Sequence, residues 1–328
     1  MLRLGTRGSQ LALYQARSVA SRLAETGGPP CEIVVIRTSG DRLQEAPLSE
    51  VGGKRLFVKE LEDALLKGEI DLAVHSSKDM PAALPDGLAI AGVLPRDDPR
   101  DAVVLPSAVE PPGVSARFSG VDELVAIIGQ TPLIGTSSVR RIAQLKRLLP
   151  GARFVPMRGN LDTRLRKLDS GEHHAIVLAA AGLGRLGFGS RISFALPVTA
   201  CVPAPGQGII AIEIRDGDAP VRQAVAAITD PDAAAALDAE RGLVEALGGG
   251  CQTPIGALAT PVGDDGLEIV AAVIALDGSR IVRATDRGSI AEAAALGQRV
   301  AERLIADGAA DILEEARRAQ CAVEGIQP

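Results

Sequence analysis

The stretch Leu4-Gly5-Thr6-Arg7-Gly8-Ser9 decides the fold, because its pattern occurs twice in the chain. An apolar strand end runs into a polar turn, and a helical pattern of apolar residues follows through 11–19. The second copy, Ile134-Gly135-Thr136-Ser137-Ser138, precedes the same helical pattern at 142–148. Each copy predicts a strand, a turn and a helix. We therefore expect two lobes of the same α/β class.

The repeat extends well beyond these turns. In each copy a second strand ends at an arginine, and a helix then ends at Gly-Glu and leads into another strand. These segments are 32–37, 61–69 and 72–74 in the first copy and 153–158, 165–172 and 176–177 in the second. Glycine at a helix end fits a C-cap. Alternating strands and helices predict mostly parallel sheets with helices on both faces, and ligands then bind at the carboxyl ends of the strands.

Two polar breaks that contain proline divide the chain, at 96–101 and 197–208. A strand at 209–214 could rejoin the first lobe, so the chain would cross between the lobes twice and form a hinge. From Pro231 an Ala-rich helix, three strands and two helices suggest a small α+β domain, with a hairpin turn at Asp277-Gly278. The predicted domains are lobe 1 (1–97 and 202–220), lobe 2 (98–201) and a C-terminal α+β domain (221–328).

Composition narrows the classes of function. The formal net charge of −6 and the aromatic content of only 2% argue against a nucleic-acid partner. The four cysteines form no CxxC pair and there are only three histidines, so we expect no metal site and no disulfide. Residues 1–20 lack the apolar region of a signal peptide, and no apolar run is long enough to span a membrane. We expect a cytoplasmic protein.

Arginines gather at the predicted strand ends and helix starts. Such positions favour anions, and arginine forks bind carboxylates bidentately. Each arginine alone could be an ordinary surface residue, but the set indicates a ligand with several carboxylates or phosphates. No nucleotide-binding glycine motif is present. The arginines concerned are Arg7, Arg140, Arg141, Arg158, Arg164 and Arg185.

Lys78-Asp79 follows a strand that is expected to be buried, 72–74. A carboxylate at the mouth of a cleft can stabilise a developing cation or transfer a proton. Asp79 could equally be a turn residue that pairs with its neighbouring lysine.

Cys251 follows three glycines, which leave its thiol uncrowded. A free thiol that accepts a covalent group fits this position. An inert turn cysteine is the alternative, and a thiol-dependent hydrolase lacks a nearby histidine.

The chain resembles the porphobilinogen deaminases. The motifs that carry the resemblance occur in the family's order and extend from the start of the chain to Gly256. They include Thr6-Arg7-Gly8-Ser9-Gln10-Leu11-Ala12, Gly52-Gly53-Lys54, His75-Ser76-Ser77-Lys78-Asp79, Gly135-Thr136-Ser137-Ser138-Val139-Arg140-Arg141, Arg158-Gly159-Asn160, Pro205-Gly206-Gln207-Gly208 and Gly249-Gly250-Cys251-Gln252.

The resemblance implies two lobes like a type II periplasmic binding protein and a small cofactor domain. It implies one dipyrromethane cofactor, held by a thioether on Cys251, onto which four porphobilinogen units are joined head to tail. The product, 1-hydroxymethylbilane, is then released. The resemblance further implies a monomer, with a possible transfer of product to uroporphyrinogen III synthase.

The resemblance also assigns the site. Asp79 is the implied catalytic carboxylate. The implied cofactor- and substrate-binding residues are Arg7, Ser9, Lys54, Ser76, Lys78, Thr136, Ser138, Arg140, Arg141, Arg158, Gly159, Arg164, Arg185 and Gln207. Each pyrrole ring carries an acetate and a propionate, so the growing chain is a polyanion, and this accounts for an arginine-lined cleft in an acidic protein.

Some features depart from the family pattern. Glu50 and Arg55 alter the charge of the segment around Lys54, and 109–129 is longer than usual. A two-lobed binding protein for an anionic small molecule, without catalysis, is the alternative function. It would have no use for Cys251.

Overall fold

The computed structural model describes residues 1–38, 58–109, 121–250 and 253–324. The predictions made for Lys54 and Cys251, and the departures at Glu50 and Arg55, lie outside these residues. Of the long segment 109–129, the structure describes Val109 and 121–129, which include helix α4 (Val121–Ile128).

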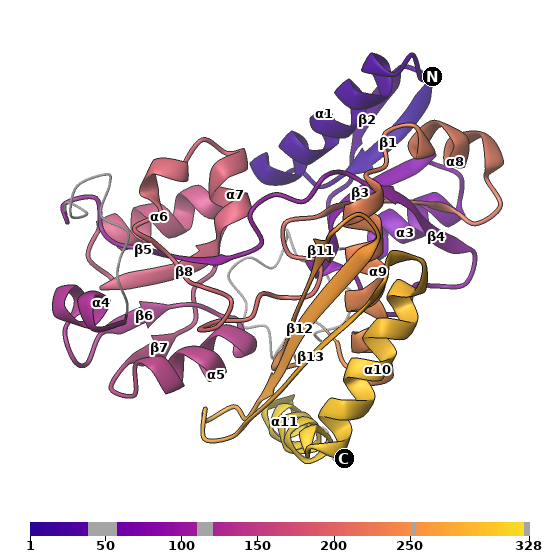
Figure 1. Ribbon diagram of the computed structural model, residues 1–328. Coiled ribbons are helices and arrows are strands. Elements are labelled where there is room, and N and C mark those ends of the chain that lie inside the picture. The colour runs from indigo at the N-terminus through magenta and orange to yellow at the C-terminus, as the bar shows by residue number, and fades with distance from the viewer. Residues whose placement is uncertain (39–57, 110–120, 251–252, 325–328) are drawn as a thin grey trace.

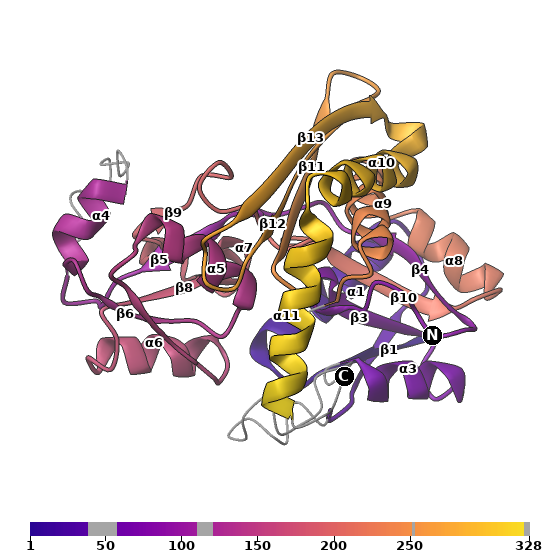
Figure 2. The ribbon, with the colours of Figure 1, turned by 90° about the horizontal axis from the view of Figure 1, so that it is seen from below.

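The first lobe is a five-stranded sheet with the order β2-β1-β3-β10-β4. Strand β10 is antiparallel to both of its neighbours, and the β1–β2 and β1–β3 pairs are parallel. Its strands are β1 (Leu2–Thr6), β2 (Cys31–Val35), β3 (Leu72–Ser76), β4 (Leu88–Val93) and β10 (Ile210–Arg215). Its helices are α1 (Gln10–Glu25), α3 (Lys59–Leu66) and α8 (Ala219–Ala226). Figure 1 shows this lobe in indigo and violet, with α8 joining from later in the chain, and Figure 2 labels β10 beside β3 and β4.

The second lobe repeats this topology with the order β7-β6-β8-β5-β9. Strand β5 is antiparallel to β8 and β9, as β10 is to its own neighbours. The strands are β5 (Asp101–Val104), β6 (Leu133–Gly135), β7 (Arg153–Val155), β8 (Ala175–Ala179) and β9 (Phe194–Ala195). Besides α4, the helices are α5 (Val139–Leu148), α6 (Leu161–Asp169) and α7 (Ala180–Arg185), and a single 3₁₀ turn lies at Gly189–Arg191. The predicted duplication of an α/β lobe is confirmed.

The antiparallel strand of each lobe comes directly after a crossing between the lobes. The predicted return of 209–214 to the first lobe is correct, since β10 pairs with β3 and β4. The first break is one residue shorter than expected, because Asp101 already belongs to β5. Strands β4, β5 and β9 and helices α4, α7 and α8 were not expected from the sequence.

The predicted glycine caps are present. Gly68 and Gly171, directly after the C-caps of α3 and α6, have φ of 70° and 83°, and their N–H groups donate to Leu65 and Leu168. This left-handed conformation favours glycine.

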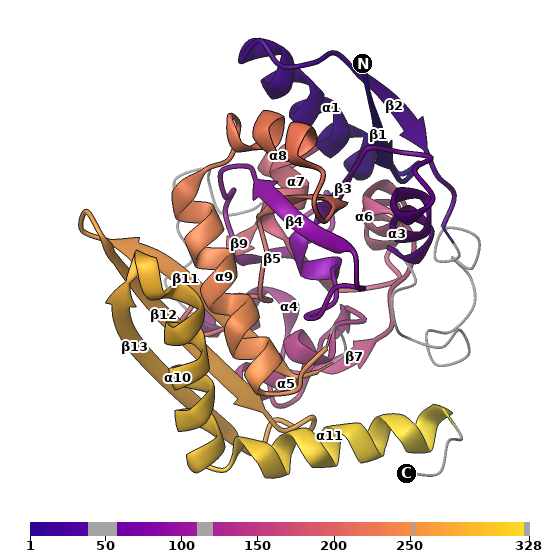
Figure 3. The ribbon, with the colours of Figure 1, turned by 90° about the vertical axis from the view of Figure 1, so that its right-hand side faces the viewer.

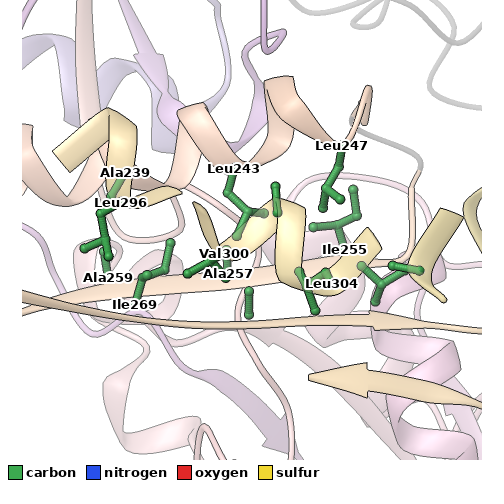
Figure 4. Packing of buried hydrophobic residues seen from close by; sticks show 14 of the residues in the cluster. Ala239, Leu243, Leu247, Ile255, Ala257, Ala259, Ile269, Leu296, Val300 and Leu304 are labelled. Atoms are coloured by element: carbon green, nitrogen blue, oxygen red, sulfur yellow. The ribbon is translucent and has the colours of Figure 1, made fainter. Parts of the chain in front are cut away.

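The C-terminal domain is an antiparallel sheet, β11-β12-β13, covered by helices. Its elements are α9 (Pro231–Ala246), β11 (Ile255–Val262), β12 (Gly266–Ile274), β13 (Ile281–Ser289), a 3₁₀ turn (Ile290–Glu292), α10 (Ala293–Ala306) and α11 (Ala309–Glu324). Figure 4 shows Leu243 of α9 and Val300 of α10 packing above Ala257 and Ile269 of the sheet. Small residues allow the helices to approach closely: a Cβ at Gly297 would meet the Ala239 carbonyl oxygen at 1.9 Å. The prediction of a small α+β domain is confirmed.

The C-terminal domain is bound to both lobes. Fully buried Glu240 of α9 receives both Nη atoms of Arg96, each at 2.8 Å, and Arg96 lies between β4 and β5. On the other side, Arg147 of α5 donates from Nη1 to the Gly278 carbonyl at 3.1 Å, in the turn between β12 and β13. Figures 2 and 3 show the sheet of this domain beside the lobes, with α9 between it and the first lobe.

Candidate functional site

A cavity of about 370 Å³ lies between the two lobes, at the carboxyl ends of β1 and β3. We call it the main cavity. It is lined by the turn after β1, the end of β3, the start of α6 and helix α7. Ten of the residues predicted to bind or react line it: Arg7, Ser9, Ser76, Lys78, Asp79, Arg141, Arg158, Gly159, Arg164 and Arg185.

The first lobe contributes a turn and a short 3₁₀ helix to this cavity. Ser9 is the N-cap of α1, and its Oγ accepts the Ala12 N–H at 3.2 Å, which fixes the turn that carries Arg7. Strand β3 ends at Ser76, and the next three residues, Ser77–Asp79, form the 3₁₀ helix. Asp79 is exposed on the cavity wall beside Lys78.

Lys78 connects the second segment that crosses between the lobes, 197–208, to the site. Its Nζ donates to Oε1 of Gln207 at 3.3 Å. Burial, followed by the nearby charges of Arg141 and Arg140, lowers the pKa of Lys78 to about 8, although Asp79 and Asp101 oppose this shift. Lys78 is therefore still mainly protonated at neutral pH, and an added anion nearby would favour its charged form.

The second lobe contributes arginines around the start of α6. Gly159 has φ of 106°, and a Cβ there would meet Thr163 at 2.7 Å, so the turn after Arg158 requires glycine. Arg164 donates from Nε to the Gly159 carbonyl at 2.9 Å. Burial, together with Arg141 and Arg158, lowers the pKa of Arg164 to about 10. A bound carboxylate would relieve this repulsion between cations.

Arg140 and Arg141 are buried and share one carboxylate, Asp101. Arg140 donates from Nη1 to Oδ2 at 2.6 Å, and Arg141 donates from Nε to Oδ1 at 2.9 Å. The two arginines also reach backbone carbonyls, those of Val202 at 2.7 Å and Val177 at 2.8 Å. Arg141 lines the main cavity, whereas Arg140 does not.

Arg185 is held at the edge of the main cavity. Its Nε donates to Asp97 Oδ2 at 2.7 Å and its Nη2 to the Gly208 carbonyl at 2.6 Å. Both partners lie on the segments that cross between the lobes. The site is thus attached directly to the hinge.

A second, smaller cavity of about 90 Å³ opens beside Gly250. Three cationic side chains line it, Lys78, Arg140 and Arg241. The hydroxyl groups are those of Ser77, Ser138 and Thr253, and no described acidic residue lines it. The Oγ of Ser77 is buried without a hydrogen-bond partner. A cationic cavity with an unpartnered hydroxyl can accept a carboxylate.

The residues that flank the predicted attachment point are part of this second cavity. Gly250 and Thr253 are hydrogen bonded to one another, with Thr253 Oγ1 donating to the Gly250 carbonyl at 2.6 Å. Two cavities rich in cations, one of them adjoining this turn, fit the polyanionic dipyrromethane that the sequence predicts there. Thr136 and Gln207 line neither cavity, and both are buried.

Sequence reasoning missed Asp101, Glu240 and Arg241. Asp101 was seen only as part of a hinge, and nothing in a single sequence shows that its partners lie on α5. Arg241 donates to the Pro81 and Ala82 carbonyls, just after Asp79, and so ties the C-terminal domain to this segment. His75, expected as a packed histidine at a strand end, is buried, and its Nε2 lies 2.9 Å from Glu213 Oε2.

The described ranges contain no group of three or more histidine, cysteine or acidic residues suited to a metal ion. No helix there is both long and apolar enough to cross a bilayer.

Two lobes of the same topology have a cation-lined cavity between them, and the third domain lines a second cationic cavity, which is the arrangement of a two-lobed α/β protein that binds anions. Residues 2–223 match the family described as "Porphobilinogen deaminase, dipyromethane cofactor binding domain", and residues 234–306 match "Porphobilinogen deaminase, C-terminal domain". The chain belongs to the porphobilinogen deaminase family.

Curated relatives are similar over nearly their whole length. The "Porphobilinogen deaminase" of Geobacter metallireducens is 44% identical over 98% of this chain and 97% of its own. That of Pelobacter propionicus is 45% identical over 96% of both chains. Among solved structures, the VFT2 domain of BvgS from Bordetella pertussis gives a TM-score of 0.40 at 17% identity, over 69% of this chain and 85% of that domain.

The expected activity is therefore established at the level of the family. The protein is a transferase of tetrapyrrole biosynthesis that deaminates and joins porphobilinogen units on a dipyrromethane cofactor. The alternative of a binding protein without catalysis is not supported.

Proposed function

We propose that Asp79 is the catalytic carboxylate and that Cys251 carries the dipyrromethane. The observation that supports both roles is the position of Lys78-Asp79. Lys78 lines both the main cavity and the second cavity beside Gly250, and Asp79, next to it in sequence, lines the main cavity with the arginines. The dipyrromethane, when bound, supplies the primer onto which the first porphobilinogen is joined.

Binding of the acidic side chains falls to the cations of both lobes. We assign the carboxylates of substrate and growing chain to Arg7, Arg141, Arg158, Arg164 and Arg185, around the main cavity. Ser9 and Ser76 supply hydroxyl groups there. Arg140, Ser138 and Lys78 serve the second cavity. Thr136 supports this set indirectly: its Oγ1 accepts the Ser138 N–H at 3.3 Å at the start of α5.

The chemistry requires a negative charge amid these cations. The carbon–nitrogen bond of the aminomethyl group breaks, ammonia leaves, and the pyrrole nitrogen lone pair compensates the electron-poor carbon. The resulting azafulvene is cationic when protonated, and the Asp79 carboxylate stabilises that charge. A new carbon–carbon bond then forms, and the attacked pyrrole carbon loses its proton. One ammonia is released for each unit joined.

We keep the predicted domains 1–97 and 202–220, 98–201, and 221–328 as a proposal, except that helix α8 packs on the first lobe, so its residues after 220 are assigned to that lobe. The strand positions support them, since β10 completes the first sheet and β9 ends the second at Ala195. We further propose a monomer in the cytoplasm that can transfer its product to uroporphyrinogen III synthase. Lys54 is also proposed to bind substrate.

The intact mass of the purified chain tests the attachment. We expect an excess of two pyrrole units in the native chain and none in Cys251→Ala. The variant should be inactive. It should also unfold at a lower temperature, because the polyanion pairs with cations that only the folded chain brings together, and this pairing stabilises the folded state. A Cys31→Ala variant, altered at a partly exposed cysteine on β2, is the matched control and should keep the adduct. An active Cys251→Ala protein would refute the assignment.

A further inference from the structure

Among the residues that the structure describes, Asp101 is the carboxylate that binds the two adjacent arginines at the start of α5, Arg140 and Arg141. It is the first residue of β5, fully buried, and it lines neither cavity. Besides Arg140 and Arg141, it accepts Gln207 Nε2 at 3.0 Å on Oδ1 and the Cys201 thiol at 3.3 Å on Oδ2. Its partners therefore come from the second lobe and from the segment that returns to the first.

The charge state of this cluster follows from its contacts. Burial alone would raise the pKa of Asp101, but the adjacent guanidinium groups of Arg140 and Arg141 outweigh it and hold the pKa far below its ordinary range. Asp101 is thus an anion with two cationic partners, and the three side chains together keep one positive charge. Burial and Asp101 both raise the pKa of the Cys201 thiol, to about 12, so this cysteine stays neutral.

The geometry separates two cations that are adjacent in sequence. Asp101 binds both Nη atoms of Arg140, whose side chain borders the second cavity. It binds Nε and Nη2 of Arg141, whose side chain borders the main cavity. Neither arginine can turn to the other cavity without giving up these bonds.

Asp101 also determines how Gln207 faces Lys78. Gln207 Nε2 donates to Asp101 and, at 2.6 Å, to the Pro99 carbonyl, so its Oε1 is left to accept Lys78 Nζ. A reversed amide would direct its donors at the ammonium group. The carboxylate thereby acts on three cations, two directly and Lys78 through Gln207.

We propose that Asp101 is a positioning residue that divides Arg140 and Arg141 between the two cavities, so that they bind carboxylates at separate places. The inference rests on the proposed function, since it concerns how the cations meet the dipyrromethane and the substrate. It differs from simple charge neutralisation, for which the directions of the two guanidinium groups would not matter.

Asp101→Asn tests this inference, with Leu168→Ala as the matched control. Leu168 is fully buried in α6 of the same lobe, so its truncation destabilises the lobe without touching the cluster. Both variants should unfold at lower temperature. Only Asp101→Asn should lower the fraction of chains with the two-pyrrole mass, and its KM for porphobilinogen should rise about tenfold or more in the loaded fraction.

The outcomes are distinguishable. Loading and KM equal to those of Leu168→Ala would overturn the positioning role. A KM below that of the native chain would also overturn it, because extra positive charge alone would then improve binding. If Asp101→Asn does not fold, the double variant Asp101→Asn/Arg140→Gln restores the net charge, and loading like the native chain would again overturn the inference. A native chain without the adduct would instead refute the proposed function.

Discussion

The two lobes share a strand order, yet they carry different side chains at corresponding places. After β3 the first lobe has a 3₁₀ helix with Lys78 and Asp79, whereas after β8 the second lobe has α7, which ends at Arg185. The second lobe also supplies Arg158 and Arg164 to the main cavity. Its one acidic lining residue, Asp162, lies in the first turn of α6, where the helix dipole favours a carboxylate.

The comparison indicates that the shared fold fixes where the turns lie, while the residues in and beside the turns determine the chemistry. We assign the reactive carboxylate to the first lobe and most of the ligand's charge to the second. Substitutions of Asp79, Arg141 and Lys78 test that division.

Asp79→Asn should have the largest effect. It keeps the size of the side chain but removes the charge that we propose faces the azafulvene, so kcat should fall by about 100-fold or more. The variant should still fold and carry the two-pyrrole mass. Steady-state formation of 1-hydroxymethylbilane at equal holoenzyme content measures this, and Asp79→Glu should retain more activity than Asn.

Asp162→Asn is the matched control in the other lobe. It removes the acidic charge that α6 places on the same cavity, and we expect kcat within a few-fold of the native value. Equal losses in the two variants would show that the division between the lobes is wrong.

Arg141→Leu should have the next largest effect. Loss of one charge-assisted bond to a carboxylate costs about 1.5–3 kcal/mol, which is roughly ten- to hundredfold in KM. Holoenzyme assembly should be impaired as well. Arg303→Leu removes an exposed arginine of α10 that donates to the Thr285 carbonyl, and it should change neither quantity. Similar losses in both would contradict the assignment of the main cavity.

Substitution of Lys78 should have the smallest effect, which is a change in how the free energy of unfolding depends on pH. Its pKa is about 8 in the fold against 10.5 for a free lysine, so the unfolded chain binds the proton more tightly between these values. The charged side chain therefore costs stability below pH 8, and this cost disappears as the pH rises toward 10.5. In the Cys251→Ala background, Lys78→Met should be more stable at pH 7, and the difference should shrink by pH 10.

Urea unfolding at pH 7, 8, 9 and 10 measures that difference. A constant gap between the two proteins would show that Lys78 does not titrate in this range. A difference in unfolding free energy that grows with pH would contradict the predicted direction of the Lys78 pKa shift.

Much of the fold could be predicted because its signals are local. The Gly-Thr turns, the helix ends at Gly68 and Gly171 and the strand at 209–214 follow from backbone preferences and apolar periodicity. Strand β9 was not predicted because it is only two residues long. Strand β4 was not predicted because 88–93 lies between polar turns and shows little alternation of polar and apolar residues. The candidate residues could also be proposed from the sequence, since they lie in the turns or near the ends of the adjoining elements, such as Arg141 in α5 and Arg164 in α6.

The sequence by itself determined the duplicated lobes, the third domain, the family and which side chains could meet a polyanion, because each depends on residues close together in the chain. Only the tertiary structure decided how those side chains are divided. Arg140 and Arg141 are neighbours in sequence, but Asp101, 39 and 40 residues away, directs them to different cavities. Contacts between distant residues depend on how the lobes pack, and no local pattern encodes them.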